Sequence, residues 1–265
     1  MYSVIACGTT GYPGCGLDRV FAGLASAGFR YVELAAIPSP QARIPVEAMD
    51  AAQIQGLRNQ LASHGLTAVS LSGHSDLIQP EGVAHLKARI DFAAALGVTI
   101  VNTGAGHAES KADEERFFAH MTQEIIPYAA ARGVKIALET HGGLTGTAED
   151  CLRTLDRLGS PWVGINYDPA NVIYYRGVRP EEDIVRVAAH VIHVHLKDKR
   201  GDRGVYDFPL LGEGTIDFRA LVATLRVAGY QGPYSAEIEV EGGPSPEEQD
   251  QMRRRTYEFM AQLLL

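Results

Sequence analysis

The sequence predicts an α/β protein that folds as one closed (β/α)₈ barrel, a single domain over residues 1–265. Short β-branched runs alternate with longer Ala- and Leu-rich amphipathic stretches, eight of each. Most amphipathic stretches end at a Gly just before the next apolar run, where a helix C-cap needs a left-handed residue. No linker or low-complexity tract divides the chain. Such alternation implies a parallel sheet, and eight units in about 250 residues are typical of the barrel.

The β-branched runs are the predicted strands, and the amphipathic stretches are the predicted helices. The strands cover residues 3–7, 29–35, 67–73, 98–104, 134–140, 162–168, 191–197 and 234–240. The helices cover residues 17–27, 47–64, 81–96, 112–132, 148–159, 181–190, 217–228 and 246–264. A doubly wound open sheet is the competing arrangement. The glycine-rich segment 8–16 lacks the GxGxxG spacing that announces the phosphate turn of such a sheet.

Composition excludes several classes of protein. Hydrophobic residues make up 46% and charged residues 21%, ordinary values for a soluble globular chain. The net charge of −8 disfavours nucleic acid and anionic membrane as partners. No apolar run reaches the roughly 18 residues of a membrane span, and we see no secretory signal, so a cytoplasmic location is expected. The three cysteines show no CxxC spacing, which argues against a disulfide framework or structural zinc.

Charged side chains recur at the ends of the last four predicted strands, which is where such barrels place their active sites. They are Glu139, Asp168, His195 and Glu237. Each alone is more often a cap or an ion-pair partner. Together, three carboxylates around one imidazole would repel one another without a cation. An oxygen-rich set with one imidazole suits Mn²⁺, Mg²⁺ or Co²⁺, with Zn²⁺ and Fe²⁺ as further candidates. The pattern therefore predicts one divalent metal ion.

Strand periodicity leaves the choice within each pair open. Residues two apart on a strand share a face. The pairs concerned are Glu139 and His141, His193 and His195, and Glu237 and Glu239. Periodicity does not decide which member of a pair contacts the ion.

The C-terminal half resembles the xylose-isomerase-like TIM-barrel sugar isomerases and epimerases. This group includes ketose 3-epimerases, hydroxypyruvate isomerase, and inosose isomerases and dehydratases. The resemblance lies in Ala137-Leu138-Glu139, Tyr167-Asp168-Pro169-Ala170-Asn171, His193-Val194-His195 and Tyr234-Ser235-Ala236-Glu237. It implies that Glu139, Asp168, His195 and Glu237 hold one metal ion, with Mn²⁺ the first candidate, and it favours Glu237 over Glu239. It also implies that Glu139 and Glu237 form the acid–base pair.

Other positions are expected to surround the substrate, although capping, surface and structural hydrogen-bonding roles compete at most of them. They are His141, Asn171, Lys197, Asp198, His107, His74 and Glu33. Asn171 departs from the resemblance, because ketose 3-epimerases carry a substrate-binding His there. Lys197-Asp198 resembles the His-x-Lys-Asp ending of many family members, and Leu211–Asp217 resembles the Gly-x-Gly loop before the last helix, where Asp217 is placed to cap.

The resemblance implies a metal-dependent isomerase or epimerase of a keto sugar or related polyol, in which proton transfer passes through a metal-stabilised enediolate. A lyase or dehydratase acting on a 3-keto sugar or cyclitol is the alternative, because both reactions begin with proton abstraction beside a carbonyl. An endonuclease IV-type repair enzyme would need more histidine ligands and a basic surface, and a non-catalytic sugar-binding protein would not need paired carboxylates. The expected partner is a small sugar, with a homodimer or homotetramer as the implied assembly.

Overall fold

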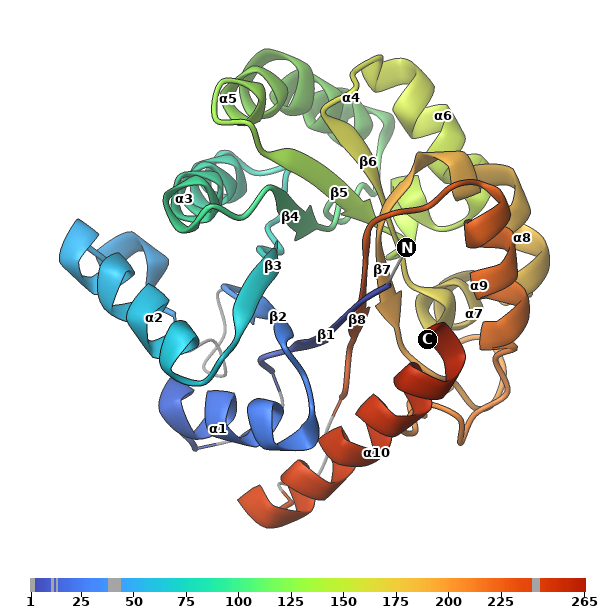
Figure 1. Ribbon diagram of the computed structural model, residues 1–265. Helices are drawn as coiled ribbons and strands as arrows, with labels where there is room; N and C mark the ends of the chain where they lie inside the picture. The colour runs from blue at the N-terminus through green and yellow to red at the C-terminus, as the bar shows by residue number, and fades with distance from the viewer. Residues whose placement is uncertain (1–2, 11, 13, 38–43, 240–243) are drawn as a thin grey trace.

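A computed structural model describes residues 3–10, 12, 14–37, 44–239 and 244–265. Eight parallel strands pair in chain order and close into a barrel, so the predicted fold class is confirmed (Figure 1). The strands are β1 (Val4–Gly8), β2 (Tyr31–Ala35), β3 (Thr67–Ser72), β4 (Ile100–Thr103), β5 (Lys135–Glu139), β6 (Val163–Tyr167), β7 (Val191–Leu196) and β8 (Pro233–Ala236). Each lies inside or within one residue of a predicted strand.

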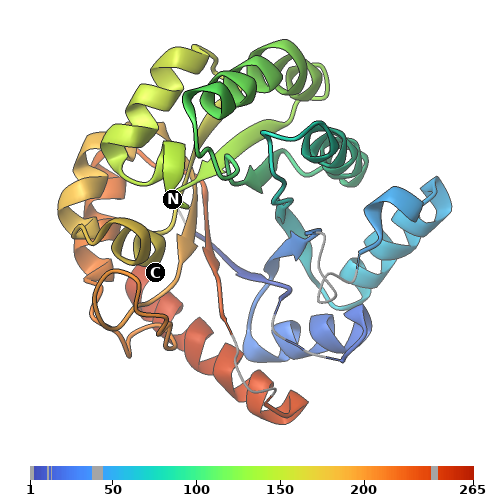
Figure 2. The ribbon, with the colours of Figure 1, turned by 180° about the vertical axis from the view of Figure 1, so that it is seen from behind.

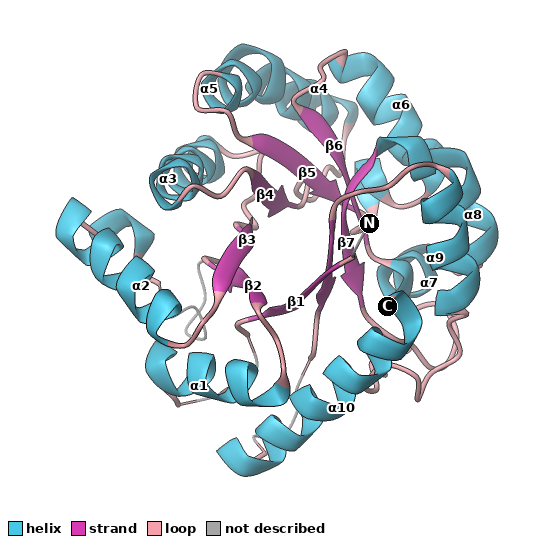
Figure 3. Ribbon diagram, in the orientation of Figure 1, coloured by secondary structure: helices cyan, strands magenta, loops and turns pink. Residues whose placement is uncertain are grey.

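Helices form a ring outside the strands, visible from both sides in Figures 1 and 2. They are α1 (Leu17–Ala27), α2 (Ala51–Ser63), α3 (Pro80–Leu96), α4 (Lys111–His120), α5 (Ile126–Ala130), α6 (Ala148–Leu158), α7 (Pro169–Arg176), α8 (Pro180–Val187), α9 (Phe218–Val227) and α10 (Pro246–Leu264). Four short helical turns, η1 (Val46–Ala48), η2 (Met121–Ile125), η3 (Gly143–Thr145) and η4 (Ala188–His190), complete the set. Figure 3 shows the helices outside the strands with loops between them.

The helix predictions hold, with one omission. The predicted stretch 112–132 is α4, η2 and α5 in succession, 47–64 is η1 and α2, and 181–190 is α8 and η4. Helix α7 was not predicted, because Asp168-Pro169 was read as a possible turn. Asp168 is in fact its N-cap, and its side chain accepts a hydrogen bond from the backbone of Asn171 at 3.0 Å. Asp at the N-cap followed by Pro at the first helical position is a recognised helix start.

The glycine caps form as predicted. The six glycines that follow predicted helices all have positive φ, which a residue with a Cβ adopts at a cost. They are Gly28, Gly65, Gly97, Gly133, Gly159 and Gly229. Each lets a helix end and turn back into the next strand. Asp217 caps α9 as expected, because its carboxylate accepts from the backbone N–H of Ala220 at 3.0 Å.

The hydrophobic core lies between strands and helices, where α1 buries Phe21 and Leu24 and every residue of β6 is buried. The ring of helices closes where α10 packs on α1, and the guanidinium of Arg19 there contacts the carboxylate of Asp250 at 2.7 Å. Cys7 and Cys151 are buried free thiols. Among the described residues, no helix combines the length and apolar character that a membrane crossing requires.

Candidate metal centre

The four predicted ligands meet at the C-terminal end of the barrel. Glu139 ends β5, Asp168 follows β6, His195 lies in β7, and Glu237 follows β8. One ligand atom from each lies within 4.8 Å of the others. We call this set the mouth cluster. Parallel strands all end at the same edge, so four consecutive strands bring these side chains together.

Asp168 is held by its neighbours but keeps one oxygen free of them. Its backbone N–H donates to the hydroxyl of Thr140 at 2.8 Å, and that hydroxyl donates to its carbonyl at 3.0 Å. One carboxylate oxygen, Oδ1, caps α7. The other, Oδ2, is buried and has no hydrogen-bond partner in the described part of the chain, and Lys197 Nζ is 3.8 Å away. A buried carboxylate oxygen without a donor is costly unless a cation neutralises it.

The ring of His195 links the mouth cluster to a second group of side chains. Its Nε2 lies 2.8 Å from Glu33 Oε1. A carboxylate accepts only, so Nε2 carries a hydrogen. Its Nδ1 faces Glu139 Oε2 at 3.2 Å and Glu237 Oε2 at 3.3 Å. The Nδ1 side of the ring is therefore the one that faces the mouth cluster.

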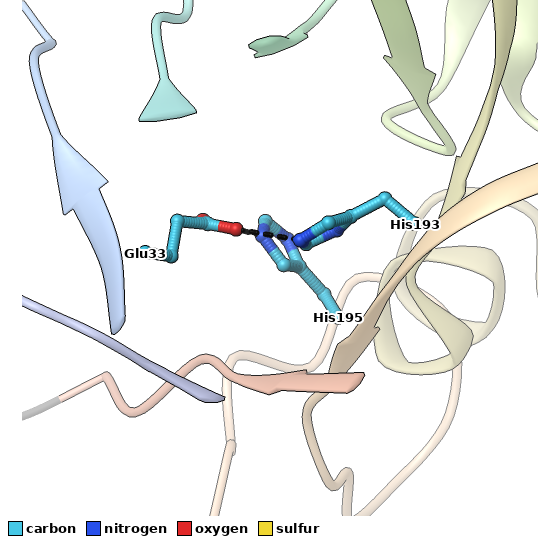
Figure 4. Close-up of side chains that lie close together, drawn as sticks. All are labelled: Glu33, His193 and His195. Atoms are coloured by element: carbon cyan, nitrogen blue, oxygen red, sulfur yellow. Dashed lines mark hydrogen bonds and ion pairs between the residues drawn. The ribbon is translucent and has the colours of Figure 1, made fainter. Parts of the chain in front are cut away.

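Glu33, His193 and His195 form this second group, which we call the inner cluster. Figure 4 shows Glu33 extending from β2 toward both histidines of β7. Glu33 Oε2 lies 2.9 Å from His193 Nε2, and it also accepts from Ser70 Oγ and Asn102 Nδ2, both at 2.8 Å. Both carboxylate oxygens of Glu33 therefore have donors from the protein itself.

The electrostatics of the two clusters differ. Burial would raise the pKa of Glu33, but the charges and hydrogen bonds of His195 and His193 outweigh it and lower that pKa well below its usual range. Burial raises the pKa of Asp168 well above its usual range; Lys197 opposes this, while Glu237 and Glu139 add repulsion. The inner cluster is thus internally balanced, whereas the mouth cluster has an excess of negative charge.

Three donors fix the carboxylate of Glu139. Asn171 Nδ2 lies 2.8 Å from Oε1, while Asn166 Nδ2 and His74 Nε2 each lie 3.0 Å from Oε2. Burial would lower the pKa of His74, but the charge of Glu139 raises it overall. Asn171 and His74 both contact a predicted ligand, and their contact with substrate stays a prediction.

Lys197 is buried beside the mouth cluster. Its Nζ lies 3.4 Å from Glu237 Oε2 and 3.4 Å from Asn171 Oδ1, and it also pairs with Glu239. Burial would raise the pKa of Glu237, but Lys197 and then His195 lower it to about 2. Glu237 is the more open of the two glutamates, with 30% of its side chain exposed against 2% for Glu139.

The remaining predicted residues take separate positions. His141 accepts or donates a hydrogen bond with the Tyr175 hydroxyl at 2.9 Å. His107 is exposed, and its ring centroid lies 6.5 Å from that of His141. Asp198 is buried and accepts from the backbone N–H groups of Lys199, Gly212 and Gly214 at 2.8–2.9 Å. Its carboxylate therefore holds the loop after β7, and Glu33 lies in the inner cluster; neither contacts the groove described below.

Sequence reasoning missed several residues that support the clusters. Asn166 donates to Glu139 and lies 3.1 Å from His195 Nδ1, and Ser70, Asn102 and Tyr175 were also not singled out. Asn166 could have been found, because it precedes Asp168 by two residues and so shares its face of the strand. Ser70, Asn102 and Tyr175 give no comparable local signal.

The donor set fits a divalent cation. Three carboxylates and one imidazole converge on one point, Asp168 Oδ2 has no donor among the described residues, and the contact of Nε2 with Glu33 turns Nδ1 of His195 toward the cluster, where a metal would replace any hydrogen on it. Oxygen-rich sets with imidazole suit Mg²⁺ or Mn²⁺, and a carboxylate on the far nitrogen is the usual second partner of a metal-bound histidine.

Comparison with known proteins agrees with the observed fold. The family model described as xylose isomerase-like TIM barrel matches residues 21–262. The L-ribulose-5-phosphate 3-epimerase UlaE of Escherichia coli is 25% identical over 181 residues, which are 66% of this chain and 62% of that protein. The match thus spans less than two thirds of the length of that relative.

Solved structures show the same fold at low identity. A xylose isomerase-like TIM barrel protein of Mycobacterium smegmatis, in complex with magnesium, superposes with a TM-score of 0.79 at 22% identity over 100% of both chains. A D-allulose 3-epimerase from Methylomonas sp., in complex with D-allulose, gives a TM-score of 0.77 at 20% identity, covering 99% of this chain and 97% of that one.

Proposed function

Because this chain belongs to the xylose isomerase-like TIM barrel family, we propose that it is a divalent-metal-dependent isomerase or epimerase of a keto sugar. The mouth cluster carries the proposal: four ligand atoms lie within 4.8 Å of one another, and one buried carboxylate oxygen has no protein donor. The names of the relatives, a ribulose-phosphate 3-epimerase and an allulose 3-epimerase, support a sugar as the substrate class.

Glu139, Asp168, His195 and Glu237 would hold the ion. When bound, a divalent cation polarises the carbonyl of a keto sugar and stabilises the negative charge that develops on its oxygen when a neighbouring C–H is deprotonated. The relative in complex with magnesium supports an ion that prefers oxygen ligands, and Mn²⁺ remains our first candidate.

Two glutamates supply the proton transfer in this proposal. Glu139 and Glu237 come from strands on different sides of His195, and both lie beside its Nδ1. Burial would raise the pKa of each carboxyl group, but His74 and His195 lower that of Glu139, and Lys197 and His195 lower that of Glu237. Both are therefore ionised at neutral pH, as a base must be to accept a proton from carbon.

The surrounding residues orient this pair. Asn171, Asn166 and His74 fix the plane of the Glu139 carboxylate through three hydrogen bonds. Lys197 holds Glu237 from the other side and offers a positive charge to an anionic oxygen of the substrate. Glu33 accepts the Nε2 hydrogen of His195 and so keeps Nδ1 turned toward the mouth cluster.

The decisive experiment combines metal content with proton exchange. Wild-type protein reconstituted with Mn²⁺ and desalted is expected to retain about one ion per chain by elemental mass spectrometry, while Asp168→Asn retains almost none. Keto sugars incubated with the loaded protein in D₂O are expected to gain solvent deuterium at carbon. Glu139→Gln and Glu237→Gln should each lower the rate of uptake by about 100-fold or more.

Matched controls keep the test specific. Asp156→Asn and Glu258→Gln change exposed carboxylates on α6 and α10 and should leave both metal content and exchange at wild-type values. Wild-type protein that retains no metal, or loaded Glu139→Gln and Glu237→Gln variants that exchange at the wild-type rate, would contradict the proposal.

A further inference from the structure

A groove of about 620 Å³ with several polar lining residues lies next to the mouth cluster. Its walls come from the loop after β3, the start of α3, the loop after β4 and His141 in the loop after β5. His74 and His141 line its inner end, and His74 contacts Glu139 at 3.0 Å. The groove therefore opens from the proposed site of reaction and runs outward over α3.

The size of the groove exceeds what the reacting group needs. Pockets of about 300–1,000 Å³ hold drug-sized ligands. A ketose placed at the mouth cluster would have its reacting carbons there, and the groove lies beside that point. A single sugar ring at the mouth cluster therefore leaves most of the groove open for a second group.

The outer wall of the groove has unused hydrogen-bonding capacity. The side chains of Gln79, Glu81 and His85 line it, and none has a hydrogen-bond or ion-pair partner within the described part of the chain. The histidines of the inner end differ, because His74 is bonded to Glu139 and His141 to Tyr175. Free amide, carboxylate and imidazole groups are suited to the hydroxyl groups of a sugar, which both donate and accept.

The charge of the groove lining indicates which class of ligand the groove favours. Among the residues that the structure describes, the groove lining contains Asp76 and Glu81 but no lysine or arginine. Two cations in the segment after β7 already face carboxylates: Lys197 pairs with Glu237 and Glu239, and Arg200 lies 3.7 Å from Glu213. Among the described lining residues, a phosphate in the groove would meet the carboxylates of Asp76 and Glu81 and no lysine or arginine, which selects against it.

We propose that this groove is a subsite for a second, uncharged sugar residue, so that the preferred substrate is a ketose carrying a glycosyl group rather than a phosphate. This inference rests on the proposed function for the placement of the ketose, but its test does not depend on turnover. It also sets this chain apart from its 25% identical relative, whose name specifies a sugar phosphate.

Four probes that share one ketose provide the test. They are D-fructose, D-fructose 6-phosphate, isomaltulose, which carries glucose on O6 of fructose, and lactulose, which carries galactose on O4. Titration calorimetry on manganese-loaded protein gives the dissociation constant of each. At least one disaccharide is expected to bind about ten-fold more tightly than D-fructose, as about two net hydrogen bonds supply, and D-fructose 6-phosphate is expected to bind less tightly than D-fructose. Equal or weaker binding of both disaccharides would overturn the proposal.

Substitutions on the outer wall of the groove test whether the second sugar residue of the disaccharide binds there. Glu81→Ala and His85→Ala should each remove most of the advantage of the disaccharide while changing the dissociation constant of D-fructose by less than about two-fold. Glu81→Lys should improve binding of D-fructose 6-phosphate, whereas Glu258→Lys, on exposed α10, should not. Full retention of the disaccharide advantage in both alanine variants would place the second residue elsewhere and refute the subsite.

Deuterium uptake into the same sugars separates this inference from the proposed function. Uptake into D-fructose with equal binding of all sugars would support the function and refute the subsite. Tighter disaccharide binding that is lost in Glu81→Ala, without deuterium uptake into any of the four sugars, would support the subsite and count against the isomerase.

Discussion

The mouth cluster and the inner cluster both combine carboxylate and imidazole groups and share His195, yet they differ in how many of their carboxylate oxygens have hydrogen-bond donors. In the inner cluster, Glu33 receives hydrogen bonds from both histidines, Ser70 and Asn102. In the mouth cluster, Asp168 Oδ2 receives none. A group of acidic and histidine side chains is thus a good candidate for an ion only where the protein leaves acceptors unsatisfied. Where every acceptor has a donor, the group supports its neighbours.

The largest expected effect comes from the inner cluster. Glu33→Ala should lower the free energy of unfolding of metal-free protein by about 3–5 kcal/mol, because it removes the buried acceptor of His193 and His195. Urea unfolding followed by circular dichroism in the presence of a chelator measures this. Glu237→Ala, in the more open mouth cluster, should cost less than about 1 kcal/mol. If Glu33→Ala does not fold, Glu33→Gln should fold with an intermediate loss of unfolding free energy. Equal losses of unfolding free energy in Glu33→Ala and Glu237→Ala would contradict the distinction between the clusters.

Binding of Mn²⁺ to the mouth cluster should give the next largest change in the free energy of unfolding. Mn²⁺ at about 100 times its dissociation constant should raise the free energy of unfolding by about 2.7 kcal/mol. Asp168→Asn should abolish this gain, because it removes the unsatisfied charge. Glu33→Gln should retain a gain but raise the dissociation constant about 10- to 100-fold, as loss of a partner behind a metal-bound histidine does. Thermal unfolding across a Mn²⁺ titration measures all three proteins, and a Glu33→Gln variant that loses the gain completely would make Glu33 a ligand.

Asp198 tests whether a carboxylate whose oxygens already have donors contributes to metal binding, and the expected change in stability is the smallest of the three. It lies close in sequence to His195, but its carboxylate accepts from three backbone N–H groups at 2.8–2.9 Å. Asp198→Asn should therefore lower the free energy of unfolding by about 1.5 kcal/mol and change the Mn²⁺ dissociation constant by less than about two-fold. Calorimetry and urea unfolding provide both values, with Asp202→Asn on the same loop as the control. A large loss of metal affinity would show that satisfied carboxylates also matter to the ion.

The barrel could be predicted from the sequence because each strand–helix unit carries its own signals within a short stretch of chain. Each unit carries its own β-branched run, amphipathic stretch and glycine cap, so the eight strands were located to within a few residues. Helix α7 was missed because its eight residues follow a strand directly, where the alternation predicts a loop. Its start at Asp168-Pro169 was readable, but its length depended on packing after β6.

The site could be predicted only in part, for a related reason. The residues of the mouth cluster all lie at or near the C-terminal ends of four consecutive strands. The sequence therefore predicts that Glu139, Asp168, His195 and Glu237 lie together. Their roles as ligands stay a prediction. Glu33 was expected at the substrate because it lies at a strand end, and its contact with His195 joins residues 162 positions apart. No periodic pattern in one strand shows which side chain of a distant strand it meets across the barrel.

That contact has a mechanical consequence for the barrel. Strands β2 and β7 are not neighbours, since β8 and β1 lie between them, so no backbone hydrogen bonds join them directly. The Glu33 carboxylate, bonded to His195 and His193 at 2.8 and 2.9 Å, ties the two walls together through the lumen. The cross-section of the cylinder at this level is thereby set by side chains as well as by strand pairing, and His195, which belongs to both clusters, is anchored to the opposite wall.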